Sequence, residues 1–250
     1  MLEQLFTPNT IAVIGASRTP GKVGHDILKN LVQGGFAGEI VAINPAAQEV
    51  LGRPCFADIS KSGKTVDLAI IAVPKDHVKI AVKDAINGGA KAVVVVAAGF
   101  KELGREGLHR EQEIAELCAG RGVRLLGPNC LGLINTAHKM NASFAGAIPM
   151  GGSISVISQS GALSTAILDL AMGRHLGLAK IVSIGNKADI SEVDLLRYLA
   201  RDEQTKVIAG YLEDIISGDD FIKAAEEAAS NKPVVILKSG TTTAGMKAEA

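Results

Sequence analysis

The amino-acid sequence predicts an α/β protein built on a doubly wound parallel sheet, followed by a second, smaller unit of the same kind. Two observations lead to this fold class. Short runs of β-branched residues are apolar almost throughout, as strands are when helices cover both faces of their sheet. Between these runs lie segments whose apolar residues recur with a helical period. An alternation of strand and helix at this spacing is typical of parallel sheets.

The first half of the chain carries strand and helix signals in strict alternation. The predicted strands are residues 11–15, 39–44, 68–74, 92–98 and 123–127. Helical stripes run through residues 23–32, 78–86 and 114–118, and the last is closed by Gly120 and Gly122, which are typical helix stop signals.

The alternation breaks in the Gly-rich stretch 144–152, which also contains Pro149, and we place a domain boundary there. Residues 1–146 are predicted to form the first domain and residues 147–250 a smaller, flavodoxin-like one. The second domain is expected to have strands at 153–158, 181–184, 207–212 and 234–237, and helices at 162–174, 193–200 and 221–229. The final residues, SGTTTAGMKAEA, predict no regular element.

Composition excludes several classes of protein. The 250 residues balance 26 Lys and Arg against 26 Asp and Glu, so no broad charge attracts nucleic acid or an anionic membrane. No apolar run reaches the roughly 18 residues of a membrane span, and no basic, signal-like segment opens the chain. The three cysteines lack metal-ligand spacing, which favours free thiols in a reducing compartment. We therefore expect a cytoplasmic protein without a metal site.

Small residues follow the predicted strands of the first domain, where open parallel sheets bind their ligands. The loop after the first strand can offer backbone N–H groups and a helix N-terminus to a phosphate. Its Gly15 and Gly21 are six residues apart, too wide for G-x-G-x-x-G, and Asn44 stands where NAD enzymes usually carry an acid. A nucleotide-like ligand other than NAD is favoured. The predicted ligand-binding residues are Gly15, Ser17, Arg18, Thr19, Pro20, Lys22, Asn44, Pro45, Val73, Pro74, Ala98 and Gly99.

Two strand-to-helix loops of the second domain carry polar groups. Ser160 is suited to cap the next helix, and the loop that it begins with Gly161 can also seat a phosphate. A serine nucleophile is disfavoured because Ile157 replaces the first Gly of G-x-S-x-G. Glu213 and Asp214 end another strand, where a solvated turn and a catalytic role are both open. His77 and His109 are interpreted as surface or packing residues.

Seven short motifs together resemble the nucleoside-diphosphate-forming acyl-CoA synthetases, a family that includes succinyl-CoA synthetase α subunits and ADP-forming acetate–CoA ligases. The resemblance covers nearly the whole chain, and GPNCLG and SQSGAL at this separation are its most specific part. The motifs are IAVIGAS (11–17), INP (43–45), AVP (72–74), AAGF (97–100), GPNCLG (127–132), SQSGAL (158–163) and GNKADI (185–190).

The resemblance implies a Rossmann-like CoA-binding domain followed by a flavodoxin-like ligase domain. The family interconverts acyl-CoA, phosphate and nucleoside diphosphate with free acid, CoA and nucleoside triphosphate, through an acyl phosphate and a phosphohistidine. Residues 17–20 would then hold CoA, Asn129 would lie near its thioester end, and Ser160 with Gly161 would receive the phosphoryl group. Glu213 would orient the active histidine. The loops near Asn129, Ser160 and Asn186 would shape the acyl pocket.

Two departures from the family pattern stand out. Family members often carry a Lys after the Asn-Pro pair, where this chain has Ala46 and Ala47, so that phosphate contact would come from Arg18 or Lys22. No histidine follows His175, so the resemblance places the phosphohistidine beyond residue 250.

The resemblance assigns Mg-nucleotide binding to an ATP-grasp domain or β subunit that the chain lacks, and it implies an oligomer. We therefore expect the CoA-binding piece of a longer ligase that is inactive alone. Two alternatives stay open: the CoA-sensing region of a protein lysine acetyltransferase, or a CoA-binding protein without catalysis. The acyl group and the choice of ADP or GDP are not predicted.

Overall fold

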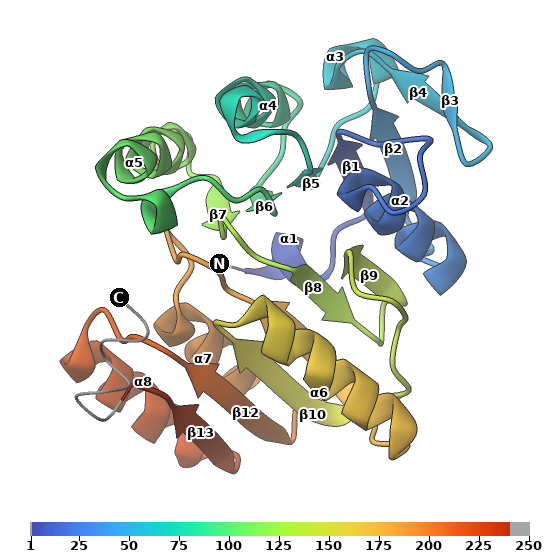
Figure 1. Ribbon diagram of the computed structural model, residues 1–250. Helices are drawn as coiled ribbons and strands as arrows, with labels where there is room; N and C mark the ends of the chain where they lie inside the picture. The colour runs from blue at the N-terminus through green and yellow to red at the C-terminus, as the bar shows by residue number, and fades with distance from the viewer. Residues whose placement is uncertain (1, 241–250) are drawn as a thin grey trace.

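The computed structural model describes residues 2–240 and contains two β-sheets with helices packed against them (Figure 1). Both sheets are built mainly of parallel strands, which confirms the predicted α/β class. The expectation for the C-terminal tail lies, from residue 241 onward, outside the described residues. Within the described part of the chain, no helix has both the length and the apolar character needed to cross a membrane.

The first sheet has the strand order β3-β4-β2-β1-β5-β6-β7. All neighbouring pairs are parallel except β3 and β4, which form a short antiparallel edge. Its strands are β1 (Thr10–Ile14), β2 (Glu39–Ile43), β3 (Glu49–Val50), β4 (Arg53–Phe56), β5 (Leu68–Ile71), β6 (Ala92–Val95) and β7 (Arg124–Leu126).

Helices cover both faces of this sheet, which is why its central strands β5 and β6 are apolar and buried at every position. On β1, Ile11 and Val13 face the side on which α2 packs, whereas Ala12 and Ile14 face the side of α4 and α5. The helices are α1 (Glu3–Phe6), α2 (Val23–Gly34), α3 (Ile59–Ser62), α4 (Lys75–Asn87), the 3₁₀ turn η1 (Lys101–Leu103) and α5 (Arg105–Ala119).

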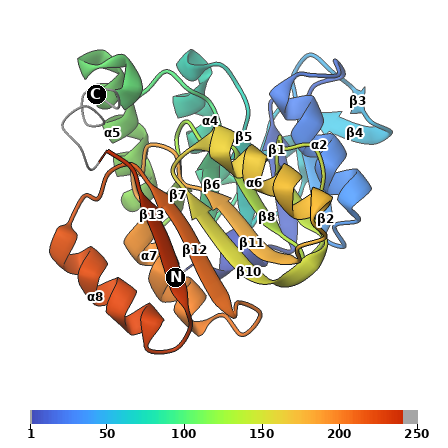
Figure 2. The ribbon, with the colours of Figure 1, turned by 60° about the horizontal axis from the view of Figure 1, so that its bottom comes forward.

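The second sheet has the order β13-β12-β10-β11-β8-β9. The first four strands are parallel, and α6 lies on one face while α7 and α8 lie on the other (Figure 2). The elements are β8 (Gly132–Asn135), β9 (Met140–Ser143), β10 (Gly151–Ser158), α6 (Gly161–Gly173), β11 (Leu178–Ser183), α7 (Glu192–Arg201), β12 (Val207–Leu212), α8 (Gly218–Ala229) and β13 (Val234–Lys238).

The hairpin formed by β8 and β9 is the main departure from the predicted order of elements. It pairs antiparallel with β11, so residues that precede the Gly-rich break belong by hydrogen bonding to the second sheet. The hairpin also packs on α2 of the first unit: Asn30 donates to the carbonyls of Ser143 (2.9 Å) and Ala145 (2.6 Å). A division between residues 146 and 147 therefore stays a prediction, because the hairpin contacts both units.

A backbone seam joins the two units along β7. Residues 185–190, which follow β11, run beside the end of β7 and its loop. The N–H of Ile190 donates to Leu125 O (3.0 Å), that of Ala188 to Gly127 O (3.0 Å), and that of Asn186 to Pro128 O (2.9 Å). The seam is reinforced by Arg124, whose guanidinium pairs with Asp189 (2.9 Å) and Asp194 (3.1 Å). The otherwise open edge of the first sheet is thus covered by the second unit.

The N-terminal helix is a second link between the units. Phe6 is fully buried and stacks on Tyr198 of α7, with ring centroids 4.4 Å apart. The carbonyl of Phe6 accepts a 2.8 Å hydrogen bond from the buried amide of Asn135 on β8. The first residues of the chain are therefore anchored to the second sheet.

We expect Phe6→Ala to lower the free energy of unfolding by about 3–5 kcal/mol, because it leaves a cavity at a buried aromatic contact. Chemical denaturation followed by circular dichroism measures this change. Ile222→Ala is the matched control: Ile222 is 55% exposed on α8, so its loss should change stability by no more than about 0.5 kcal/mol. Equal effects of the two substitutions would contradict the anchoring role of Phe6.

The buried thiols give a second test of the packing. Burial raises the pKa of Cys118 and of Cys130 to about 12, so at pH 8 only about one in ten thousand of these thiols is ionised. Ellman's reagent at pH 8 should therefore leave both unmodified in the folded chain and react with all three cysteines after denaturation. The half-buried Cys55 should react faster than the other two. Rapid labelling of Cys118 or Cys130 in the folded chain would contradict this packing.

Candidate functional site

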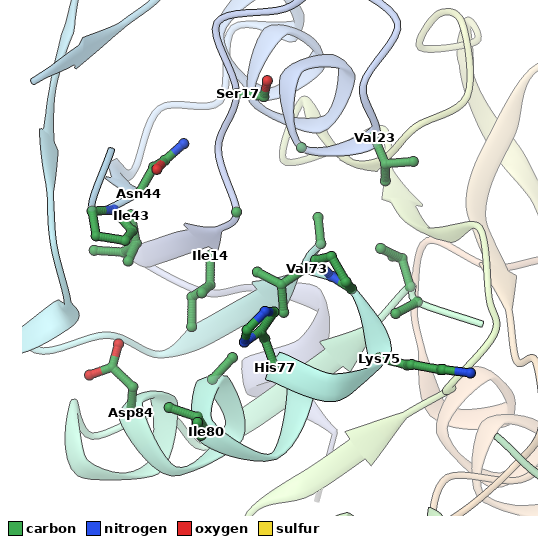
Figure 3. Close-up of a pocket in the computed structure, with 18 of the residues that line it drawn as sticks. Ile14, Ser17, Val23, Ile43, Asn44, Val73, Lys75, His77, Ile80 and Asp84 are labelled. Atoms are coloured by element: carbon green, nitrogen blue, oxygen red, sulfur yellow. The ribbon is translucent and has the colours of Figure 1, made fainter. Parts of the chain in front are cut away.

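A cavity of about 1140 Å³ lies at the carboxyl ends of the first sheet's strands, where the sequence predicts ligand binding (Figure 3). Its walls come from the loops after β1, β2, β5 and β6 and from one side of α4. The predicted residues that line it are Gly15, Ser17, Lys22, Asn44, Pro45, Val73, Pro74 and Ala98. Arg18, Thr19 and Pro20 lie exposed on the same loop as Ser17 but are not among the lining residues, and Gly99 is buried beside the cavity.

The loop between β1 and α2 is held close to the sheet by two glycines. Gly15 has φ +93°, and a Cβ on it would lie 2.5 Å from Ala72 O. A Cβ on Gly24 would lie 1.9 Å from Gly15 O, so the first turn of α2 can approach the loop only without a side chain there. Buried His25 fixes the loop further, because its Nδ1 lies 2.9 Å from Ser17 O.

Asn44 at the end of β2 also fixes this loop. Its Nδ2 donates to Ala16 O (2.7 Å), and its Oδ1 accepts from the N–H of Ala46 (2.8 Å). Both ends of the side-chain amide are thus engaged by the protein backbone. The side chain therefore shapes the cavity wall, and no acid stands here to bind a ribose as in NAD enzymes.

One side of α4 forms the opposite wall. His77, Ile80 and Asp84 follow one another along it and face the strand ends that carry Ile14, Ile43 and Val73 (Figure 3). His77 was interpreted as a surface or packing residue; it is exposed and lines the cavity, which the sequence did not indicate. The lining also includes three lysines, of which only the first was predicted: Lys22, Lys75 and Lys83.

These lysines offer positive charge to a ligand with phosphates. Asp84 opposes them at one end of the cavity. Burial raises the pKa of its carboxyl, although the 3.1 Å hydrogen bond from the N–H of Ile59 acts in the other direction. Lys75 and Lys83 belong to α4, and Lys22 lies directly before α2. The N-terminus of α2 therefore adds its N–H groups to the positive charge of Lys22.

A second cavity, of about 720 Å³, lies between the two units. It brings together Asn129 and Glu213, which the sequence assigned to one site although they are 84 positions apart. Asn186 lines it too, as the prediction for the acyl pocket requires. Its other lining residues are Lys101, Glu102, Gly104, Arg105, Leu108, Gln159, Gly185 and Asp214.

The turn that carries Glu213 is held by its neighbours. Gln159 Oε1 accepts from the N–H groups of Glu213 (2.9 Å) and Asp214 (3.1 Å), while its Nε2 bonds to the Asp214 carboxylate. Fully buried Lys187 pairs with Asp214 Oδ1 at 2.6 Å and with buried Glu192 at 3.2 Å. Burial would raise the pKa of Asp214, but hydrogen bonds from Lys187 and Gln159 lower it.

Ser160 and Gly161, which the sequence predicts to bind a phosphate, lie next to this cavity. Ser160 caps α6, as the sequence predicts: its Oγ accepts from the N–H of Leu163 at 3.2 Å. Gly161 is the first residue of α6. Neither is among the residues that line the second cavity, whereas Gln159, which precedes them, is. Sequence reasoning missed Gln159, although its place within SQSGAL was a signal that could have identified it.

Two family models match separate parts of the chain. The family model described as a CoA binding domain matches residues 9–136, and that of the succinyl-CoA ligase like flavodoxin domain matches residues 151–250. The sequence is 45% identical to an ADP-forming acetate–CoA ligase I of Archaeoglobus fulgidus over 99% of this chain and 36% of that protein. It is 39% identical to the α subunit of ADP-forming acetate–CoA ligase I of Pyrococcus furiosus, over 100% of this chain and 55% of that subunit.

A solved structure has the same fold over the whole chain. The apo form of the dinucleotide forming acetyl-coenzyme A synthetase 1 of Candidatus Korarchaeum cryptofilum superposes with a TM-score of 0.96 at 40% identity, covering 100% of this chain and 55% of that one. The chain therefore spans between about a third and about half of the length of these relatives. By fold, motifs and these matches, the chain belongs to the NDP-forming acyl-CoA synthetase family and comprises its CoA-binding and flavodoxin-like domains.

Proposed function

We propose that this chain is the CoA-binding part of an NDP-forming acid–CoA ligase. The observation that carries the proposal is the first cavity, which lies at the strand ends of a sheet whose sequence matches a CoA binding domain. Its volume of about 1140 Å³ exceeds the roughly 300–1,000 Å³ of ordinary small-molecule pockets. Lysines and a helix N-terminus suit the phosphates of CoA, and the small residues Gly15, Ala72 and Ala98 let an elongated ligand lie against the backbone.

The second cavity supports a role for this chain in ligase chemistry. The second cavity lies beside the first. Asn129 lines the second cavity, and its N–H donates to the carbonyl oxygen of Ala97, which lines the first cavity (3.0 Å). A CoA whose nucleotide lies in the first cavity would bring its thiol to this boundary. Glu213, held on a fixed turn, is suited to orient the imidazole of a phosphohistidine that another part of the enzyme would supply.

The partner that fits this proposal is an ATP-grasp domain or subunit, which would bind the Mg-nucleotide. The relative in Pyrococcus furiosus is named as an α subunit, which supports assembly with a second chain. The net reaction converts an acid, CoA and a nucleoside triphosphate into acyl-CoA, phosphate and the nucleoside diphosphate. In this reaction the present chain would bind CoA, acyl group and phosphate.

CoA binding is tested by isothermal titration calorimetry. We expect micromolar affinity for the wild-type chain and at least a tenfold loss in Ala98→Trp, because the indole would occupy the first cavity. Ala98 is exposed, so the substitution leaves the core intact, and Ala119→Trp at the exposed end of α5 is the matched control with unchanged affinity. The proposal fails if the wild-type chain does not bind CoA.

A ligase assay tests the role of Glu213 in the protein that joins this chain to its ATP-grasp part. We expect Glu213→Gln to lower kcat by about 10²–10⁴-fold, the usual size of a lost acid–base or orienting contribution. CoA affinity should not change, because Glu213 lies in the second cavity. Glu226→Gln, on an exposed position of α8, is the control. A Glu213→Gln enzyme with normal turnover would contradict the assigned role.

A further inference from the structure

The side-chain amide of Asn186 is buried where the two units meet, and carboxylates of the first unit surround its nitrogen. Nδ2 donates to Glu102 Oε2 (2.7 Å) and to Glu111 Oε2 (2.8 Å). Asn186 is 6% exposed and Glu111 5%. Both carboxylates are tied to the segment between β6 and α5, since Glu102 accepts from the N–H of Phe100 (3.2 Å) and Glu111 from that of Lys101 (3.2 Å).

These two acceptors fix the orientation of the amide. Glu102 is ionised at neutral pH: burial would raise its pKa, but hydrogen bonds from Asn186 and from the backbone lower it. A carboxylate accepts hydrogen bonds and cannot donate them. Burial raises the pKa of Glu111, so the orientation rests on the ionised Glu102. Turning the Asn186 amide by 180° would place its oxygen against Glu102 Oε2, so Nδ2 must face the two carboxyl groups and Oδ1 must face the opposite way.

The oxygen of Asn186 in turn fixes Asn129. It lies 3.3 Å from Asn129 Nδ2, and because it can only accept, the nitrogen of Asn129 must point toward it. The backbone of Asn129 is also held, with φ +58° and its N–H bonded to Ala97 O at 3.0 Å. Asn129 is exposed in the second cavity. Within residues 2–240, no protein donor forms a hydrogen bond with its side-chain oxygen, Oδ1.

We propose that Asn186 is a positioning residue that holds the side chain of Asn129 with its Oδ1 toward the ligand. There Oδ1 would accept a hydrogen bond from an N–H or S–H donor at the thiol end of CoA. The inference rests on the proposed function and specifies which atom of Asn129 the ligand meets. The chain of contacts runs from two anchored carboxylates through one buried amide to one exposed amide. Asn186 acts only through Asn129 and does not itself contact the donor.

A double-mutant cycle on CoA affinity tests this coupling. The variants are Asn129→Gly, which tolerates the positive φ, Asn186→Ala, and their combination, all measured by titration calorimetry on the 250-residue chain. Loss of one neutral hydrogen bond should weaken CoA binding by about three- to tenfold in Asn129→Gly. Asn186→Ala should also weaken CoA binding measurably, by no more than Asn129→Gly does, and the double variant should bind no more weakly than Asn129→Gly alone; unchanged CoA affinity in Asn186→Ala would overturn the inference.

The matched ligand control is 3′-phospho-ADP, the nucleotide half of CoA, which under the proposed function would fill only the first cavity. Its affinity should be the same in all variants. If Asn186→Ala does not fold, Asn186→Ser replaces it, since a hydroxyl can donate to one of the carboxylates but is too short to reach Asn129.

Each remaining outcome has one meaning. Additive losses of CoA affinity, or an equal loss of 3′-phospho-ADP affinity, would show a merely structural role and overturn the inference. Unchanged CoA affinity in Asn129→Gly would overturn it as well. A wild-type chain that binds neither ligand would instead refute the proposed function, and the inference with it.

Discussion

The site depends on one constraint, the backbone seam between the two sheets. Residues 185–190 hydrogen-bond along the end of β7, and a Cβ on Gly185 would lie 2.2 Å from Pro128 O, so the two backbones are in direct contact. Every group of the second cavity is placed relative to this seam: Asn129 stands on one side and Asn186 on the other. If only side chains were in contact, rotamer changes would allow the two units to shift against each other. Contact between backbones prevents such shifts. Catalytic groups that come from different units need this rigidity to keep their relative positions.

Buried charge strengthens the seam at its second-unit side. Lys187 is fully buried beside the seam and pairs with Glu192 and Asp214. Lys187 and Glu192 are both buried, whereas the Asp214 side chain is 54% exposed. Burying two charged groups costs free energy unless they pair, so the arrangement favours a single geometry more than it adds stability. Lys187 also donates to the carbonyl of Asp214 (3.0 Å), and so it links the seam to the turn that carries Glu213. The position of that carboxylate in the second cavity therefore follows from the position of the seam.

The sequence predicted what depends on periodicity and local loop chemistry. Most of the parallel strands, the long helices and the cap at Ser160 were predicted, because apolar runs and capping residues report on local structure, whereas β4 and the short helices α1 and α3 were not. The β8–β9 hairpin was not predicted, because its strands owe their place to antiparallel pairing with β11, which lies more than 40 positions further along the chain. Lys75 and Lys83 were missed for a related reason: they are ordinary surface lysines in the sequence, and only the approach of α4 to the strand ends gives them a cavity to face.

The GPNCLG motif shows how packing and chemistry divide within a family signature. Gly127 has φ +94°, and a Cβ there would lie 2.5 Å from Val95 O, so its identity is imposed by its backbone conformation and by the closeness of β6. Cys130 is buried and donates to Val95 O (3.4 Å), and burial raises the pKa of its thiol to about 12, so it packs as a protonated side chain near neutral pH. Asn129 alone in this motif presents an exposed polar side chain to the second cavity. Most of the motif therefore identifies the fold, and the chemistry that the fold serves has to be argued from single residues such as Asn129 and Glu213.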